Sequence, residues 1–199
     1  MKSILFIISM LVGGMLAAQS FSEISPSAPF IDVSASAVEF ADVDGDGDLD
    51  VLISGYNGSH GLVRLYTNDG AGNYTEVPNT LFQDLEAGSI TFADIDGDND
   101  QDVLTTGRLK AFSFSILYKN DGTGAFTRVL TPFVGVEFSE TVFLDVDGDN
   151  DQDVLITGID DTTSVAKLYL NDGSGNFTEK ANTPFVGAVY SAIDFADID

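Results

Sequence analysis

The sequence predicts an all-β fold of β-propeller blades, each made of four antiparallel strands, and three repeated features support this prediction. An acidic block, FADVDGDGDLDVLISG from residue 40, returns in similar form from residues 92 and 143, and FADID begins another copy at residue 195. A second block, LYTNDG from residue 65, returns in similar form from residues 117 and 168. A phenylalanine also stands ten residues before the phenylalanine that opens each acidic block. Four-stranded sheets that repeat at a period near 50 residues are typical of propeller blades.

The repeats divide the chain into units with a period of 51 to 52 residues. The predicted units are residues 30–81, 82–132 and 133–184, followed by a partial unit at 185–199. A propeller ring needs at least about four blades. Three full units and the start of a fourth therefore predict an incomplete ring, and we expect the chain to be the N-terminal part of a longer protein.

Each unit is expected to contain its four strands in a fixed order. The first strand precedes the acidic block, as in SITFADI and TVFLDV, and the second is the apolar run DVLISG or its equivalent. The third strand, LVRLYTN in the first unit, ends at Asn-Asp-Gly, which is a strong turn signal. A short fourth strand is expected around Tyr74, Phe126 and Phe177. The strands alternate only weakly in polarity, which favours sheets that are covered on both faces.

The N-terminal segment is typical of a secretory signal peptide, predicted at residues 1–18 and followed by a linker at residues 19–29. Lys2 precedes an apolar stretch, residues 4–16, and small residues follow at Ala17 and Ala18. An uncleaved anchor helix is the alternative, but a membrane-spanning helix needs about 20 apolar residues. The chain has no cysteine, which excludes disulfides and suggests that a metal stabilises this secreted protein instead.

The charge of the chain excludes some classes of partner. Its formal net charge is -24, from 32 acidic and 8 basic residues. Such a chain repels nucleic acid and anionic membrane surfaces, and no membrane span is expected in the mature chain. Because seventeen of the 32 acidic residues fall in the recurrent aspartate clusters, the charge indicates bound cations rather than a solvated acidic surface.

The acidic loops carry aspartates at positions 1, 3, 5, 7 and 9, counted from the first aspartate of each loop. Two unit charges about 4 Å apart near a protein surface repel by roughly 4 kcal/mol, so five carboxylates on one tight loop call for a cation. Oxygen ligands without histidine or cysteine favour Ca²⁺, at about one ion per complete repeat, over softer metals or Mg²⁺. The candidate metal ligands are Asp42, Asp44, Asp46, Asp48, Asp50, Asp94, Asp96, Asp98, Asp100, Asp102, Asp145, Asp147, Asp149, Asp151, Asp153, Asp197 and Asp199.

The spacing within the loops also indicates how they wrap an ion. Position 4 is always Gly, and position 6 is Gly47 in the first loop but Asn99 and Asn150 in the others. Both residue types tolerate positive φ. Position 12 is never the Glu that an EF-hand requires, so the aspartate at position 9 is expected to close the site. Position 7 is expected to bind through its backbone carbonyl.

These blocks closely resemble the FG-GAP/VCBS-type repeats of integrin-α-like calcium-binding β-propellers, over essentially all of residues 30–199. The resemblance implies that the aspartate loops hold Ca²⁺ between two strands of a blade. It further implies a secreted or cell-surface module that binds an extracellular protein or glycan, as in adhesion, with the ions in a structural role. The alternative is a catalytic or non-catalytic part of a secreted polysaccharide-degrading enzyme.

Few residues suggest catalysis, and no catalytic residue is expected. His60 is the only histidine and lies in a Gly- and Asn-rich segment without counterparts in the other units. Segments 56–61, 108–114 and 159–164 occupy the same place in the repeat yet differ in sequence. This variation is typical of a binding edge and equally of neutral loop drift. The phased aromatic residues are expected to pack between blades; they are Tyr66, Tyr118, Tyr169, Phe40, Phe92 and Phe143.

Overall fold

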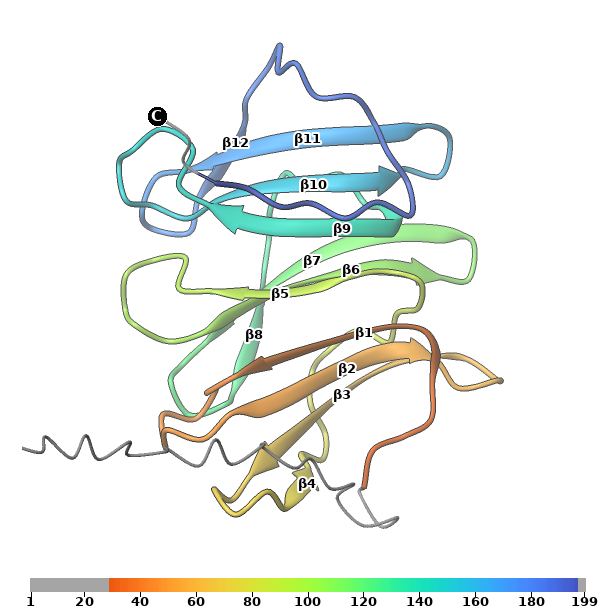
Figure 1. The fold of residues 1–199 in the computed structure, drawn as a ribbon, viewed down its shortest axis with the longest axis vertical. Helices are drawn as coiled ribbons and strands as arrows, with labels where there is room; N and C mark the ends of the chain where they lie inside the picture. The colour runs from red at the N-terminus through yellow and green to blue at the C-terminus, as the bar shows by residue number, and fades with distance from the viewer. Residues whose placement is uncertain (1–28, 197–199) are drawn as a thin grey trace, which may run out of the picture.

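Three four-stranded antiparallel sheets, stacked face to face, make up the computed structural model of the protein (Figure 1), which describes residues 29–196. The predicted signal peptide and nearly all of the predicted linker lie outside the described residues, as do Asp197 and Asp199. The described residues contain no helix, and therefore no helix that could cross a membrane. The all-β prediction is confirmed, and the three sheets form no closed ring.

Within each sheet, the strands follow one another in chain order, as a meander. The first sheet contains β1 (Ser34–Ala41), β2 (Asp50–Tyr56), β3 (Gly61–Asn68) and β4 (Tyr74–Glu76). The second contains β5 (Ile90–Ala93), β6 (Asp102–Leu109), β7 (Phe112–Asn120) and β8 (Phe126–Val129). The third contains β9 (Glu137–Leu144), β10 (Asp153–Ile159), β11 (Ser164–Asn171) and β12 (Phe177–Glu179). All four strands expected in each full unit are present.

The hydrophobic core lies between the sheets. Leu52 and Leu65 of the first sheet pack with Val103 and Ile116 of the second in one buried cluster. A second cluster joins the second sheet to the third through residues that include Leu104 and Ile156. Successive residues of β6 therefore face different neighbouring sheets, which explains why the middle strands read as continuous apolar runs.

One aromatic arrangement occurs in all three units. Phe82 packs edge-on against Tyr118 at 5.0 Å between ring centroids, and the hydroxyl of Tyr118 accepts a hydrogen bond from the backbone N–H of Gln83 at 2.8 Å. Phe30 with Tyr66, and Phe133 with Tyr169, repeat this geometry. All three tyrosines are buried. Tyr118 and Tyr169 belong to the clusters between sheets, as predicted, whereas Tyr66 packs with Val51 and Ile53 of its own sheet.

The packing prediction is wrong for one of the phased phenylalanines. Phe143 is buried and Phe92 packs partly buried against the core, but Phe40 is 51% exposed. Phe143 and Phe92 pack toward the preceding sheet. Among the described residues no sheet precedes the first, so Phe40 has no such neighbour.

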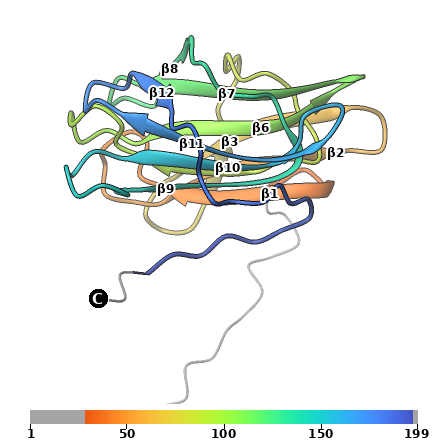
Figure 2. The same cartoon turned by 90° about the horizontal axis from the view of Figure 1, so that it is seen from above.

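A repeated backbone contact connects the units along the first strands. Ala87 donates its N–H to the carbonyl of Ala35, Phe138 donates to Ala87, and Tyr190 donates to Phe138, at distances of 2.6 to 3.1 Å. All four residues have positive φ, between 46° and 57°. Seen from above, the first strands β1 and β9 lie on one side of the stack and the short strands β8 and β12 on the opposite side (Figure 2).

Because each sheet is an antiparallel meander, its loops gather at the two ends of the strands, on opposite sides of the stack (Figure 1). The acidic loop joins the first strand to the second at one end, where the Asn-Asp-Gly turn also joins the third strand to the fourth. The variable segments join the second strand to the third at the other end. Repeated and variable sequence are thus separated in space.

Candidate metal centres

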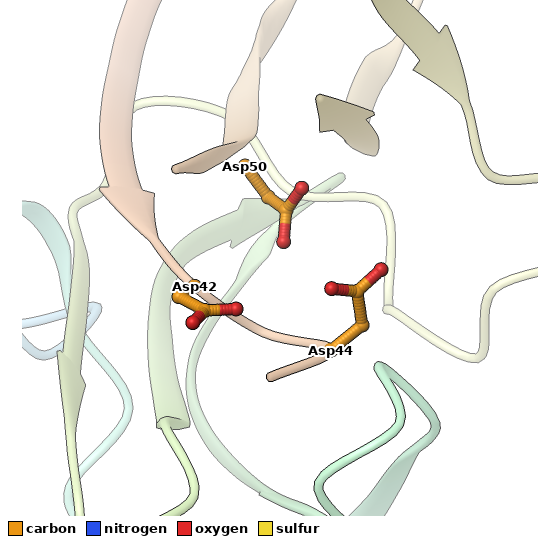
Figure 3. Close-up of side chains that lie close together, drawn as sticks. All are labelled: Asp42, Asp44 and Asp50. Carbon is orange, nitrogen blue, oxygen red and sulfur yellow. The ribbon is translucent and has the colours of Figure 1, made fainter. Parts of the chain in front are cut away.

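Each acidic loop gathers three aspartates at positions 1, 3 and 9. One carboxylate oxygen of each of Asp42, Asp44 and Asp50 lies within 4.8 Å of the others (Figure 3). The same holds in the second loop for Asp94, Asp96 and Asp102, and in the third for Asp145, Asp147 and Asp153. Ca²⁺ binds oxygen at about 2.3–2.6 Å, so oxygens on opposite sides of the ion lie about 4.6–5.2 Å apart. The spacing of the three carboxylates fits such an ion.

The first aspartate organises the loop backbone. Asp42 accepts the N–H groups of Gly45 and Gly47 at 2.8 and 2.9 Å, one on each carboxylate oxygen. Asp94 and Asp145 accept the equivalent pairs, in which Asn99 and Asn150 stand at position 6. The residues at positions 4 and 6 have φ between 69° and 91°, as the Gly and Asn pattern predicts.

The aspartate at position 9 of each loop begins the second strand and is fully buried. Asp102 accepts the N–H of Ile95 at 3.1 Å on one oxygen and the N–H of Asn120 at 2.8 Å on the other. Asp50 and Asp153 make the same two contacts in their own loops. This aspartate therefore fastens position 2 of the loop to the end of the third strand.

Burial disfavours the ionised form of the aspartates at position 9 of the first two loops. Burial raises the pKa of Asp102 to about 6, although the two backbone N–H groups oppose the rise and the charges of Asp96 and Asp98 add to it. Burial likewise raises the pKa of Asp50. A divalent cation at the loop would stabilise the ionised form of both groups.

In the first two loops, the aspartate at position 3 has an oxygen without a partner. Oδ1 of Asp44 and Oδ1 of Asp96 are both buried and accept no hydrogen bond. An orphaned buried carboxylate oxygen costs free energy unless a donor or a cation satisfies it. Two such oxygens, at equivalent positions of two loops, fit a site for a hard cation.

The aspartates at positions 5 and 7 lie outside these groups of three. The carboxylates of Asp46, Asp98 and Asp149 accept the N–H of the position 7 residue in their own loops. The carboxylates at position 7 lie against the glycine of the Asn-Asp-Gly turn, at Gly70, Gly122 and Gly173. The placement of position 7 is compatible with binding through its carbonyl, which stays a prediction, as does the ligand role of position 5.

The asparagine of each Asn-Asp-Gly turn is a site residue that the sequence reading missed. Its backbone N–H donates a hydrogen bond to the aspartate at position 9, always 18 residues earlier. In the second and third units its side chain also reaches the preceding loop. Asn120 donates Nδ2 to the carbonyl of Val43 at 2.8 Å, and Asn171 donates to the carbonyl of Ile95 at 2.7 Å. The constant spacing of 18 residues was the signal that could have found it.

The other candidates lie away from the aspartate loops. His60 is exposed in the hairpin between β2 and β3, and its backbone N–H binds Asn57 Oδ1. The side chain of Asn57 holds this hairpin closed, and Asp160 does so between β10 and β11. Both hairpins belong to the variable segments at the end opposite the aspartate loops.

Comparison with known proteins identifies the repeats. The sequence profile described as FG-GAP-like repeat matches residues 42–105 and 145–199. These two regions contain the three aspartate loops described above. No curated protein matches the chain.

Proposed function

Because the chain belongs to the FG-GAP-like repeat family, we propose that it is a calcium-binding β-propeller module that acts by binding an extracellular protein or glycan. Each described aspartate loop holds one Ca²⁺, and the ions are structural. The observation that carries this proposal is the threefold gathering of carboxylates at positions 1, 3 and 9.

The proposed role of the ion follows from what the loop connects. The aspartate at position 1 orders the loop backbone, and the aspartate at position 9 connects the loop to the second and third strands. An ion among these carboxylates would cancel their repulsion and lock the two strands together. Because it would bind the folded loop and not the unfolded chain, it would stabilise the fold by mass action. Extracellular modules often bind Ca²⁺ with Kd of about 10⁻⁴ to 10⁻³ M, and we expect that range or tighter.

The variable hairpins are the proposed ligand-binding surface. They lie on the side of the stack opposite the repeated ion loops and differ from unit to unit. Phe112, at the start of β7, is 66% exposed there. Binding residues are commonly carried on variable loops by a rigid scaffold. Secretion, which the N-terminal segment suggests, would place this surface outside the cell in a calcium-rich medium.

Thermal unfolding with and without Ca²⁺ tests the ion sites. We expect a higher Tm in Ca²⁺ than in chelator, and a calorimetric titration with about three sites per chain. The Asp44→Asn variant keeps the side-chain shape but removes one charge, so it should lose one site and part of the Tm rise. A chain that binds no Ca²⁺ and unfolds at the same temperature in chelator would overturn the proposal.

A matched control separates ligation from total charge. Asp32→Asn removes the same charge from an exposed aspartate outside the loops. We expect this variant to keep all the sites and the full Tm rise. The binding role is tested separately, by screening the calcium-loaded chain on protein and glycan arrays. Hits that disappear when Phe112 is changed to Ser would support the hairpin surface, and hits that persist would move the surface elsewhere.

A further inference from the structure

The second aspartate loop contains a cation of its own. Lys119 lies on β7, next to Asn120, and its ammonium contacts Asp96 Oδ2 and lies 3.2 Å from Asp98 Oδ2. These are the aspartates at positions 3 and 5 of the loop. The contact raises the pKa of Lys119, through its hydrogen bond to Asp96 first, so the lysine is charged at neutral pH.

Neither of the other two described loops has a lysine at this position. Thr67 and Leu170 occupy the position of Lys119 in the first and third units, and all three residues are half-buried. Among the described residues, no other lysine or arginine forms an ion pair with an aspartate of the three loops. The second loop therefore has a tethered positive charge that the first lacks, while Gly124 and Gly175 of the following units pack against the first and second loops alike.

We propose that Lys119 acts as a tethered cation that competes with Ca²⁺ at the second loop. Of the first two loops, both of which a following unit packs against, the second should therefore bind Ca²⁺ with the lower affinity. This inference rests on the calcium-binding function proposed above. An ion that takes the carboxylate of Asp96 must displace the ammonium. Because β7 holds the lysine within reach, the displaced charge still repels the ion.

The same contact gives the second blade a partial substitute for the ion. Asp96 and Asp98 keep a paired ammonium when Ca²⁺ is scarce. Among the described residues no lysine or arginine pairs with the equivalent aspartates of the first and third loops, and Lys180 acts on Asp147 only at longer range. The second blade is therefore expected to depend less on Ca²⁺ for its stability than its neighbours. Three sites that differ in this way would fill in at least two steps as the concentration of Ca²⁺ rises.

Exchanging residues between the units tests the proposal. Lys119→Leu places in the second unit the residue that the third unit carries naturally. By calorimetric titration with Ca²⁺, we expect the second loop of this variant to bind roughly fivefold or more tightly, as removal of one partly exposed charge near a divalent ion allows. The reverse exchange, Leu170→Lys, should weaken the third loop by a similar factor. Asp94→Asn, which removes a ligand of the second loop, should abolish the weak step of the parent chain.

Lys167→Leu is the matched control, because Lys167 pairs with Glu179 at 2.6 Å and contacts no aspartate loop. It removes the same charge and should leave all the calcium affinities unchanged. In chelator, Lys119→Leu should lower the Tm more than Lys167→Leu does, because only the former leaves loop carboxylates without a cation.

The outcomes separate the two proposals. If the first and third loops bind Ca²⁺ and Lys119→Leu leaves the affinity of the second loop unchanged, the tethered-cation proposal is overturned alone. If the parent chain binds no Ca²⁺ at any loop, the proposed function fails and this inference fails with it. A gain in affinity for Lys119→Leu that Lys167→Leu does not share would support both.

Discussion

At the scale of single residues, the glycines of the Asn-Asp-Gly turns decide how closely the turn packs on the aspartate loop. Gly70 has φ of 72°, and a Cβ at this position would overlap the carboxylate of Asp48. Gly72, in the same turn, has φ of 84°, but a Cβ there would meet nothing within 4 Å. Comparing alanine substitutions at the two glycines therefore distinguishes the cost of positive φ from the cost of crowding.

Gly70→Ala should consequently destabilise the protein more than Gly72→Ala. Positive φ costs an alanine about 1–2 kcal/mol at either position, and at Gly70 the carboxylate of Asp48 must also move aside. Urea unfolding of both variants in saturating Ca²⁺ measures the difference. Equal losses for the two variants would show that the turn does not press on Asp48.

Some residue-level features follow from the sequence and others do not. The alternating aspartates and the Gly or Asn at positions 4 and 6 predicted a tight loop with positive φ, and the structure confirms it. The positive φ of Ala35, Ala87 and Phe138 could not be predicted, because neither residue type favours that conformation. There the contact between neighbouring units, through one backbone hydrogen bond each, overrides the local preference.

At the scale of elements, the asparagine side chains link each aspartate loop to the next sheet. Asp102 binds the N–H of Asn120, and the side chain of Asn120 binds the carbonyl of Val43, which lies in the preceding loop. All three residues are buried. Asn171 repeats this link between the second and third units. A continuous chain of hydrogen bonds thus runs through all three loops.

Asn120→Ala and Asn171→Ala should each destabilise the stack by about 1–3 kcal/mol, because each leaves a buried carbonyl of the preceding loop without its donor. Asn68→Ala is the matched control. Asn68 occupies the same turn, but its side chain donates only to the exposed carbonyl of Leu49 at 3.2 Å. Chemical denaturation of the three variants measures the losses, and an equal loss for Asn68→Ala would contradict the link between sheets.

The sequence predicted the elements better than their partners. Strands, turns and the order within each sheet follow from local patterns that repeat three times. The link from Asn120 to Val43 joins residues 77 positions apart. Such a contact depends on how one sheet stacks on the next, and a turn signal such as Asn-Asp-Gly explains only the local bend.

At the scale of the whole molecule, the first strands of the three sheets line a cavity of about 410 Å³. Glu39 of β1 and Glu140 of β9 are among its lining residues, with Ser89 near β5 and Tyr190 beyond the third sheet. The first strands lie side by side along this cavity only because the three units stack in register. The repeat period predicted the stacking, but the two glutamates stand at different positions of their units, so their meeting could not be read from the repeat.

The two glutamates make the stability of the stack depend on pH in a predictable direction. Burial raises the pKa of Glu140 above its ordinary value of 4.5, and the charge of Glu39 raises it further. In the pH window from 4.5 up to this raised pKa, the folded chain holds a proton that the unfolded chain has released. The contribution of Glu140 to stability is therefore greatest below this window and is lost as the pH rises through it.

Glu140→Gln removes this charge while keeping the side-chain shape, so it should raise stability at neutral pH. The difference in unfolding free energy between this variant and the parent should grow as the pH rises from 4.5 and then level off. Urea unfolding across the pH range in constant Ca²⁺ measures that difference, in which the titration of the aspartate loops cancels. Glu39→Gln should lower the pKa of Glu140 and narrow the window. A difference that does not change with pH would mean that water reaches Glu140 freely and that the row of first strands is open to solvent.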